Sequence, residues 1–362
     1  MEIPNNSFVG GLAVIDEAPP QDDLVLAPEW VDWLIENYVD GVPLVELAAT
    51  LEGAGVPPAV IRGNLRQLKA SALLGGLRKK VVFHDQLQSL VDLKRSLAGL
   101  GPVTTVERRE NVSAHDFFEN YYAANRPVIL TDVAHEWPAL KLWSRPAYFA
   151  ETFGDTELTV CMGRESDPYC DRNFAAHLQT TTMRKYVAWL ESAGETNDGY
   201  LISNNRLLEN ECFHRLLEDV VAPQAYVDPN RFYTYMSFWF GPAGTRTPLH
   251  HDGNNILFCQ VVGEKEFYLV SPWETELMRR AEGYYAHTQV PPGFVGEGLR
   301  EPDPAFPWRA QRVVLKPGEA LFLPVGWWHQ VRALQLSVSL SFLNFRTENQ
   351  FKWYAPGKLN EL

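Results

Sequence analysis

The stretch Thr247-Pro-Leu-His-His-Asp252 brings an imidazole and a carboxylate together, at His250 and Asp252. In extended chain, residues two apart project to the same side, so these two groups can share one metal ion. A second imidazole would complete the set of two histidines and one carboxylate that suits non-haem Fe(II) and leaves coordination positions open. His329, which closes the turn Pro324-Val-Gly-Trp-Trp-His329, is the candidate.

Short apolar segments separated by Gly and Pro turns surround both histidines. They predict strands at 200–203, 232–240, 256–262, 265–270, 313–315, 320–323, 329–331 and 336–345. Many short strands of this kind predict a mainly β fold, an antiparallel sandwich or barrel. We expect both histidines at strand starts within this β region, so that they can meet at one rim.

Lys265 is a third candidate site residue. On the predicted strand 265–270 it shares a face with Phe267 and Leu269, which are apolar. A buried ammonium without a partner is costly, so the lysine needs one. An anionic co-substrate is one such partner. The alternative is a lysine at the sheet edge that extends its amine into water.

The motifs, taken in order, resemble one family. Thr247-Pro-Leu-His250-x-Asp252 is followed by Gln260-Val-Val-Gly263-x-Lys265 and by Leu315-Lys-Pro-Gly318 before the His329 turn. This order resembles the JmjC and cupin-like Fe(II)/2-oxoglutarate oxygenases, and most nearly the hydroxylase branch that includes factor inhibiting hypoxia-inducible factor. The likeness covers about residues 104–346. It implies a double-stranded β-helix, or jelly-roll, core at about 200–346.

The resemblance also implies roles for individual residues. His250, Asp252 and His329 would bind Fe(II), and Lys265 would bind the distal carboxylate of 2-oxoglutarate. Thr247 and Tyr200 would donate hydroxyl hydrogen bonds to this co-substrate, and Asn344 would correspond to a pocket asparagine. His251, between the two ligands, should point away from the metal by strand alternation.

Two positions depart from related sequences. Relatives often have Asn six residues after the first ligand, where this chain has Ile256; Asn254 or Asn255 would have to substitute. Other oxygenase branches use an arginine about ten residues after the distal histidine. Ser339 stands there instead, which supports the role of Lys265.

The reaction implied by the resemblance is hydroxylation of an amino-acid side chain in a peptide or protein, with O2 as the oxidant. Alternatives are hydroxylation of a free amino acid or other small molecule, demethylation of an N-methyl group, and a non-enzymatic metal-binding regulatory module. The connection 271–312 is long for a loop between strands, and long loops over a site usually shape binding. It contains Tyr284, Tyr285, His287, Phe294, Phe306 and Trp308, which could form walls for an extended chain.

The amino-terminal part has helical rather than strand periodicity. We expect a flexible lead-in at 1–27, a helical domain at 28–101 and the oxygenase domain at 102–362, with the join at Gly101-Pro102. Apolar stripes predict helices around Trp30–Tyr38, Leu44–Leu51 and after Pro57-Pro58, with a fourth from Gln86 to Leu97.

Short helices in this order could also form a helix-turn-helix. Residues 1–100 carry eight Lys/Arg against thirteen Asp/Glu, a net charge of −5. We therefore favour a domain for packing or dimerisation, with a homodimer as the expected assembly.

Composition restricts the partners and the compartment. The formal net charge of the 362 residues is −13, and no long basic block occurs. This disfavours nucleic acid or an anionic membrane as the main partner and favours basic or neutral substrates. No pair of the four cysteines forms a C-x-x-C motif, which predicts a reduced, cytoplasmic compartment. We find no signal-peptide pattern in the first twenty residues and no apolar stretch long enough to cross a bilayer.

Overall fold

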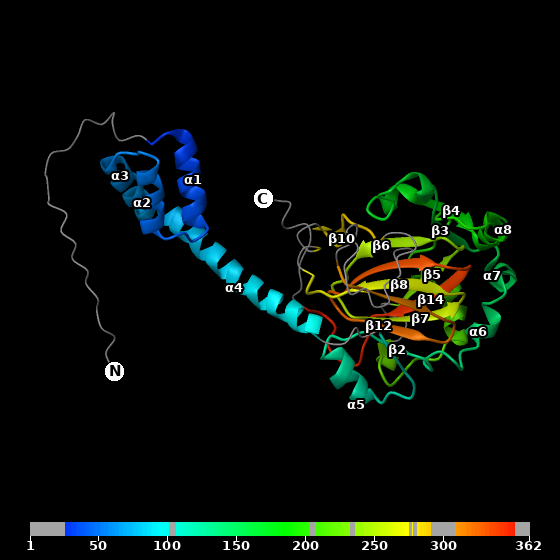
Figure 1. Cartoon of the computed structure of the whole chain (residues 1–362). Helices are drawn as coiled ribbons and strands as arrows, with labels where there is room; N and C mark the ends of the chain where they lie inside the picture. Colours follow the sequence, from blue (N-terminus) through cyan, green and yellow to red (C-terminus); the bar gives the residue numbers. More distant parts are fainter. Residues whose placement is uncertain are drawn as a thin grey trace. The chain divides into compact units, whose positions relative to one another are not determined.

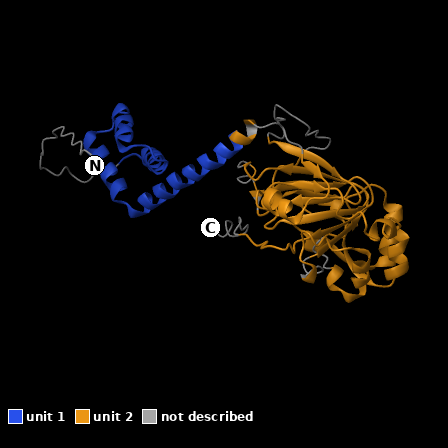
Figure 2. Cartoon of the chain, turned by 90° about the horizontal axis from the view of Figure 1, so that it is seen from below, with its two compact units in different colours: residues 1–96 blue, residues 97–362 orange. Residues whose placement is uncertain are grey.

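The computed structural model describes residues 26–100, 106–202, 207–231, 236–274, 277, 281–290 and 308–351. The chain divides into two compact units, Met1–Ser96 and Leu97–Leu362 (Figure 2). The lead-in expected at 1–27 lies outside the described residues except for its last two. The join expected at Gly101-Pro102 also lies outside them.

The first unit is helical (Figure 1). Its helices are α1 (Pro28–Val39), α2 (Leu44–Gly53), α3 (Pro58–Ala70) and α4 (Ala72–Leu100), of which α4 continues past the end of the unit. Prolines at the first turns of α1 and α3 start these helices, because a helix leaves its first N–H groups unbonded in any case. The helices enclose a core that includes Leu34, Leu47, Leu51, Ile61 and Leu68.

The fourth helix is longer than the sequence pattern indicated. It begins at Ala72, not at Gln86, and includes the basic run Arg78-Lys79-Lys80. The Arg78 guanidinium donates hydrogen bonds to the carbonyls of Tyr38 (3.1 Å) and Gly41 (2.8 Å), at the end of α1. A cation there satisfies carbonyls that the helix leaves unbonded. This contact between distant segments explains why local periodicity missed the helix start.

The second unit is built on two six-stranded sheets (Figure 1). The first sheet has the order β1 (Glu107–Arg109), β2 (Val128–Leu130), β12 (Ala320–Leu323), β7 (Ile256–Val262), β14 (Ser337–Phe342), β5 (Met236–Gly241). The second has the order β11 (Ala310–Leu315), β8 (Lys265–Val270), β13 (Trp328–Ala333), β6 (Arg246–His250), β10 (Tyr285–Ala286), β9 (Ala281–Glu282). The predicted fold class, amino-terminal helices followed by a β-rich cupin-like region, is confirmed.

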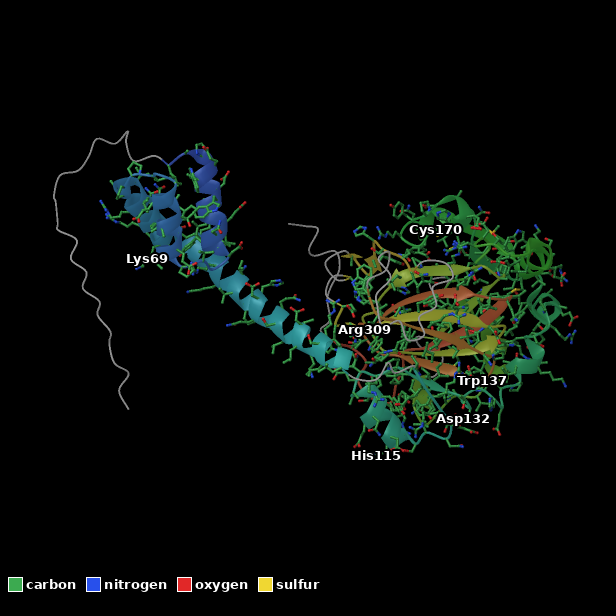
Figure 3. The ribbon with its side chains drawn as sticks, in the orientation of Figure 1. Lys69, His115, Asp132, Trp137, Cys170 and Arg309 are labelled. Carbon is green, nitrogen blue, oxygen red and sulfur yellow. The ribbon has the colours of Figure 1, made fainter. Side chains whose placement is uncertain are left out.

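Alternate residues of the central strands form the core shared by the two sheets. It includes Phe258, Phe267, Leu269, Leu321 and Val331. The opposite face of the first sheet is covered by helices α5 (Ala114–Phe117), α6 (Ala139–Leu142), α7 (Pro146–Phe153) and α8 (Met183–Ala193). On this side Trp137, labelled in Figure 3, packs edge-on against Phe342 of β14.

The remaining elements are short. A two-stranded sheet pairs β3 (Glu157–Cys161) with β4 (Leu178–Thr182). One π-helical turn spans Phe118–Tyr122, and 3-10 turns span Arg164–Ser166, Phe174–His177, Leu207–Glu209, Glu211–Asp219 and Pro229–Arg231. None of the helices in the described part of the chain has the length and apolar character needed to span a membrane.

Two expectations about strands near the site differ from the structure. Tyr200 and Leu201 make only isolated bridges, to Cys161 and Phe240, and residues 203 and 232–235 lie outside the described part. His250 is the last residue of β6 and not the start of a strand, whereas His329 is the second residue of β13. The two strands run antiparallel, so the end of one and the start of the other still lie at the same edge.

Candidate metal centre

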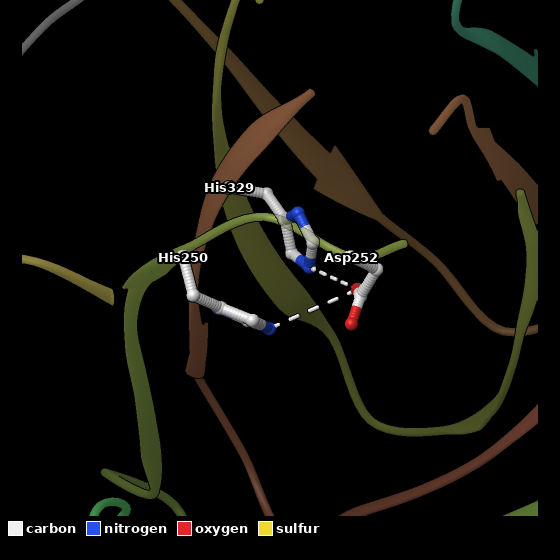
Figure 4. A group of neighbouring side chains, drawn as sticks. All are labelled: His250, Asp252 and His329. Atoms are coloured by element: carbon white, nitrogen blue, oxygen red, sulfur yellow. Dashed lines mark ion pairs between the residues drawn. The ribbon is translucent and has the colours of Figure 1, made fainter. Parts of the chain in front are cut away.

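The register of β6 and β13 brings the two predicted histidines together. His250 and His329 are direct partners across these strands, and Asp252 follows in the loop after β6. The Asp252 Oδ2 lies 3.3 Å from His329 Nε2 and 3.9 Å from His250 Nε2 (Figure 4). The three ligand atoms lie within 4.8 Å of one another, which is close enough for one ion to bind all three. In the described part of the chain, this is the one such group of His, Cys, Asp or Glu.

Hydrogen bonds to backbone carbonyls orient both rings. His250 Nδ1 lies 2.8 Å from the carbonyl of Pro248, and His329 Nδ1 lies 3.0 Å from the carbonyl of Trp327. A carbonyl only accepts, so each Nδ1 carries the proton and each Nε2 presents its lone pair to the centre. Metal-binding histidines are commonly oriented in this way through their second nitrogen.

The charge state of the site suits a divalent cation. Burial, together with the neighbouring His329, lowers the pKa of His250 and favours a neutral imidazole. Burial alone would raise the pKa of Asp252, but its interactions with the nearby His329 and His250 lower it to about 2. The resulting donor set combines two imidazole nitrogens with an ionised carboxylate oxygen, the set that suits non-haem Fe(II).

A network around Asn255 holds the two ligand segments together. Asn255 is 1% exposed, and its side-chain oxygen accepts from the Val325 N–H at 2.7 Å. Asn349 bonds both backbone groups of Asn255 at 2.9 Å, and the Gly326 N–H donates to the Asp252 carbonyl at 3.1 Å. The loop that carries Asp252 is therefore fixed to the turn before His329.

This network includes Asn254 and Asn255, either of which was expected to replace the asparagine that relatives have where this chain has Ile256. The side chain of Asn255 holds the turn, and the amide of Asn254 lies 2.7 Å from the Asn349 carbonyl. A contact from either of them to 2-oxoglutarate stays a prediction.

Lys265 lies buried inside the β region. It is 1% exposed, and its ammonium donates to the Tyr200 hydroxyl at 3.2 Å. The rings of Tyr200, Trp239 and Phe258 surround it, with centroids 5.6, 5.7 and 5.1 Å from Nζ. Burial lowers the pKa of Lys265 from its ordinary value of 10.5 to about 7. A buried lysine whose charge is penalised in this way is suited to a carboxylate ligand.

Tyr200 and Thr247 lie at the same place as Lys265. Burial raises the pKa of Tyr200, against the nearby charge of Arg164 and a hydrogen bond from Thr247. Arg164 stacks 5.5 Å from the Tyr200 ring and is itself fixed by Asp171 at 3.1 Å. The structure thus brings the lysine and both hydroxyls together, and their contact with 2-oxoglutarate stays a prediction.

Asn344 has a different environment. Its side-chain amide donates to the Asp228 carbonyl at 3.1 Å, and its backbone carbonyl accepts from the Asp228 N–H at 2.8 Å. Asn344 therefore joins the end of β14 to the segment at 228. Its contact with the co-substrate stays a prediction.

Two neighbours of the ligands complete the site. His251 is buried against Trp328, with ring centroids 4.7 Å apart, so it points away from the metal as predicted. Tyr285 of β10 stacks on His250 at 5.7 Å, and the Arg172 guanidinium lies 5.7 Å over the Tyr285 ring. The sequence indicated Tyr285 only as one wall residue among several, because the β6–β10 pairing that places it has no local signal.

We predict that His250→Ala, Asp252→Ala and His329→Ala each weaken Fe(II) binding by more than about 100-fold, since loss of even a supporting partner of a ligand typically costs 10- to 100-fold. Anaerobic titration calorimetry with Fe(II) measures the effect. His287→Ala, an exposed histidine, is the matched control. Unchanged affinity in one of the three variants would remove that residue from the ligand set.

We predict that Lys265→Met weakens 2-oxoglutarate binding by about ten- to a hundred-fold, the value of a charge-assisted hydrogen bond. Without co-substrate, the same variant should be more stable than the parent at pH 7, because it removes a charge that is costly to bury. The folded-state pKa is lowered, so parent stability rises between about pH 7 and 10.5 and the gap to the variant narrows there.

Binding isotherms and urea unfolding across this pH range test both parts, with exposed Lys316→Met as control. A Met variant that is less stable than the parent and retains 2-oxoglutarate would identify Lys265 as purely structural.

Comparison with known proteins agrees with this geometry. A model of the cupin-like domain family matches residues 114–351. Lysine-specific demethylase 8 of Xenopus tropicalis is 32% identical over 250 residues, which cover 66% of this chain and 52% of the relative. Lysine-specific demethylase JMJ30 of Arabidopsis thaliana is 29% identical over 242 residues, covering 66% and 54%.

A third relative carries the name of a hydroxylase. The human bifunctional peptidase and (3S)-lysyl hydroxylase JMJD7 is 26% identical over 262 residues, covering 62% of this chain and 79% of that protein. The chain spans a little over half the length of the two demethylases. These comparisons relate the chain to JmjC-domain proteins and do not single out the branch that includes factor inhibiting hypoxia-inducible factor. Because the family model matches most of the second unit, the chain belongs to the cupin-like domain family.

Proposed function

We propose that this protein is an Fe(II)- and 2-oxoglutarate-dependent hydroxylase of an amino-acid side chain in a peptide or protein, with lysine as the first candidate. The observation that carries the proposal is the presence of a His–Asp–His set and a buried lysine in one β framework. Lys265 lies four residues from Leu269 on β8, and Leu269 is the strand partner of His329. The two sites are therefore roughly 13 Å apart along the strand. The lysine side chain and a five-carbon dicarboxylate together can bridge this separation.

Different residues of the chain would bind the metal and the co-substrate. His250, Asp252 and His329 would hold the metal, with both imidazoles already fixed by backbone carbonyls. Lys265 and Tyr200 would anchor the far carboxylate of 2-oxoglutarate among aromatic rings that exclude water. When bound, Fe(II), 2-oxoglutarate and O2 together supply an oxidant for a C–H bond, coupled to the release of succinate and carbon dioxide.

Two hollows near the metal site support a peptide segment as the substrate. Two adjoining hollows of about 340 and 260 Å³ share Pro168, Asp171, Pro248 and Gln289 in their walls. Tyr285, which stacks on His250, lines the smaller hollow. Acidic and basic side chains both line the larger one, which suits a peptide segment better than an apolar small molecule.

Lysine is the first candidate because of the relatives. Two of them are named as lysine-specific demethylases and one as a (3S)-lysyl hydroxylase. The same names make demethylation of an N-methyl-lysine the second candidate, since oxidation of an N-methyl carbon releases formaldehyde. The products distinguish the two reactions.

We predict that the protein, reconstituted anaerobically with Fe(II) and 2-oxoglutarate and then exposed to O2, adds one oxygen atom to lysine peptides without releasing formaldehyde. Paired peptides carrying lysine or Nε-methyl-lysine at the same position serve as substrates, and mass spectrometry and a formaldehyde assay read the products. The Asp252→Ala variant is the control for oxidation that does not depend on the site.

Each alternative has its own signature in this experiment. Formaldehyde in step with the loss of one methylene would establish a demethylase instead. Substrate-coupled turnover of free amino acids but of no peptide would point to a small-molecule hydroxylase. Binding of metal and 2-oxoglutarate without substrate-coupled turnover would favour a regulatory module.

The expected homodimer has a candidate interface on α4. A row of large apolar side chains lies exposed along one face of this helix: Phe83, Leu87, Leu90 and Leu97, each 47% to 61% exposed. In an antiparallel pair centred on Leu90, these side chains face one another, and Asp85 of one copy lies beside Arg95 of the other. The apolar row and this pair of opposite charges favour a second copy as the partner of this face.

We predict that Leu87→Glu combined with Leu90→Glu yields a monomer, because two charges would be buried in each half of the pair. Sedimentation velocity over a range of concentrations measures the change. Val45→Glu, which is exposed on α2, should leave the parent assembly intact. A parent protein that is monomeric at every concentration would contradict the proposed pairing.

A further inference from the structure

The basic residues of the first unit are concentrated in one segment. Between Glu52 and Asp85 the chain contains six Lys or Arg residues and no Asp or Glu: Arg62, Arg66, Lys69, Arg78, Lys79 and Lys80. In the first unit, the acidic residues of the described helices lie on α1 and α2 and further along α4. The whole-chain charge of −13 averages this separation away and is a poor guide to the local surface.

The segment begins at a tight turn that joins two helices, α2 and α3. Four residues, 54–57, connect α2 to α3, and Gly55 adopts a left-handed conformation with φ of +81°. The Val56 N–H returns to the Leu51 carbonyl at 3.0 Å and closes the end of α2. A helix, a turn of three or four residues with Gly, and a second helix packed on the first are the parts of a helix-turn-helix.

The packing of α3 determines which face it leaves open. Val60, Ile61 and Leu68 are buried in the core of the unit. Arg62, Arg66 and Lys69 follow one another at spacings of four and three residues, so they share the opposite face. All three are exposed, and none forms an ion pair within the described part of the chain. Lys69 is labelled in Figure 3.

The other residues on this face are small or polar. Ala59 and Gly63 lie beside the cations, and α3 has no acidic residue. None of the described residues of α3 is an exposed large hydrophobic side chain. The centres of protein interfaces are rich in aromatic and other apolar side chains, so this face is a poor match for a protein partner. Small residues between cations instead allow close approach to a phosphate-lined groove.

We infer that the first unit binds double-stranded DNA, with α3 inserted in the major groove and Arg62, Arg66 and Lys69 contacting phosphates or base edges. The major groove of B-form DNA admits an α-helix, and the second helix of a helix-turn-helix is the one that enters it. The major groove of an RNA duplex is too deep and narrow for this docking. This function is separate from the oxygenase chemistry. It replaces the expectation, drawn from the net charge, that nucleic acid is not a partner.

Arg78 is left out of this surface for a structural reason. Its guanidinium is occupied by the carbonyls of Tyr38, Gly41 and Val42 at the end of α1. Replacing it would damage the fold of the unit, so it is unsuitable for a test. Arg62, Arg66 and Lys69 have no such role and can be changed together.

The test uses the full-length protein and a fluorescein-labelled pool of random-sequence DNA duplexes, about three helical turns long. Fluorescence anisotropy is measured across a range of salt concentrations. The parent should bind, with an affinity that falls steeply as salt rises, because each phosphate contact releases counterions. Arg62→Gln, Arg66→Gln and Lys69→Gln combined should weaken binding at least ten-fold and reduce the log–log salt slope by about three, close to one for each cation.

The matched control removes three exposed cations from the second unit: Lys141→Gln, Lys185→Gln and Arg215→Gln. It changes the net charge equally and should bind DNA like the parent. Thermal melting and Fe(II) titration confirm that both triple variants are folded. The inference is overturned if the parent fails to bind at low salt, if the α3 variant and its control bind alike, or if an RNA duplex of the same length binds as tightly as DNA.

Discussion

The pairing of His250 with His329 is the constraint on which the candidate metal site depends. These residues are far apart in sequence, and only the antiparallel register of β6 and β13 makes them neighbours. An irregularity in that register between His329 and Val331 lets Thr247, and not Pro248, pair with Val331. Thr247 thereby lies on the same face as His250 and reaches Tyr200. A shift of one residue in either strand would turn these groups to the other face and disperse the site.

The second constraint is the free-energy cost of burying polar groups between the same two sheets. Lys265 takes a position between the sheets that an apolar residue would occupy at lower cost, and its lowered pKa reflects that cost. Aromatic rings and one hydroxyl reduce the penalty without removing it. Phe267 and Leu269 continue the same face with apolar side chains, so a lysine at this position costs stability. Such departures from the rules that maximise stability are expected at functional positions.

Much of this could be predicted from sequence wherever the signal is local. Strands 256–262, 265–270 and 320–323 were predicted with the bounds that β7, β8 and β12 have, because alternation and the turn at Gly263 are local features. The candidate ligands were found by motif and spacing. The start of α4 depends on Arg78 reaching α1, and the place of Tyr285 depends on a β pairing across 35 residues. Neither of these long-range contacts leaves a periodic trace in the sequence.

The net charge of the chain is likewise a poor predictor of the charge on one local surface. Residues 1–96 account for −5 of the net charge and residues 97–362 for −8, yet every charged side chain on α3 is positive. A net charge describes the long-range field, whereas recognition depends on the charges within about a Debye length, roughly 8 Å at physiological salt. The net charge of the chain therefore does not exclude nucleic acid as a partner of the face formed by Arg62, Arg66 and Lys69.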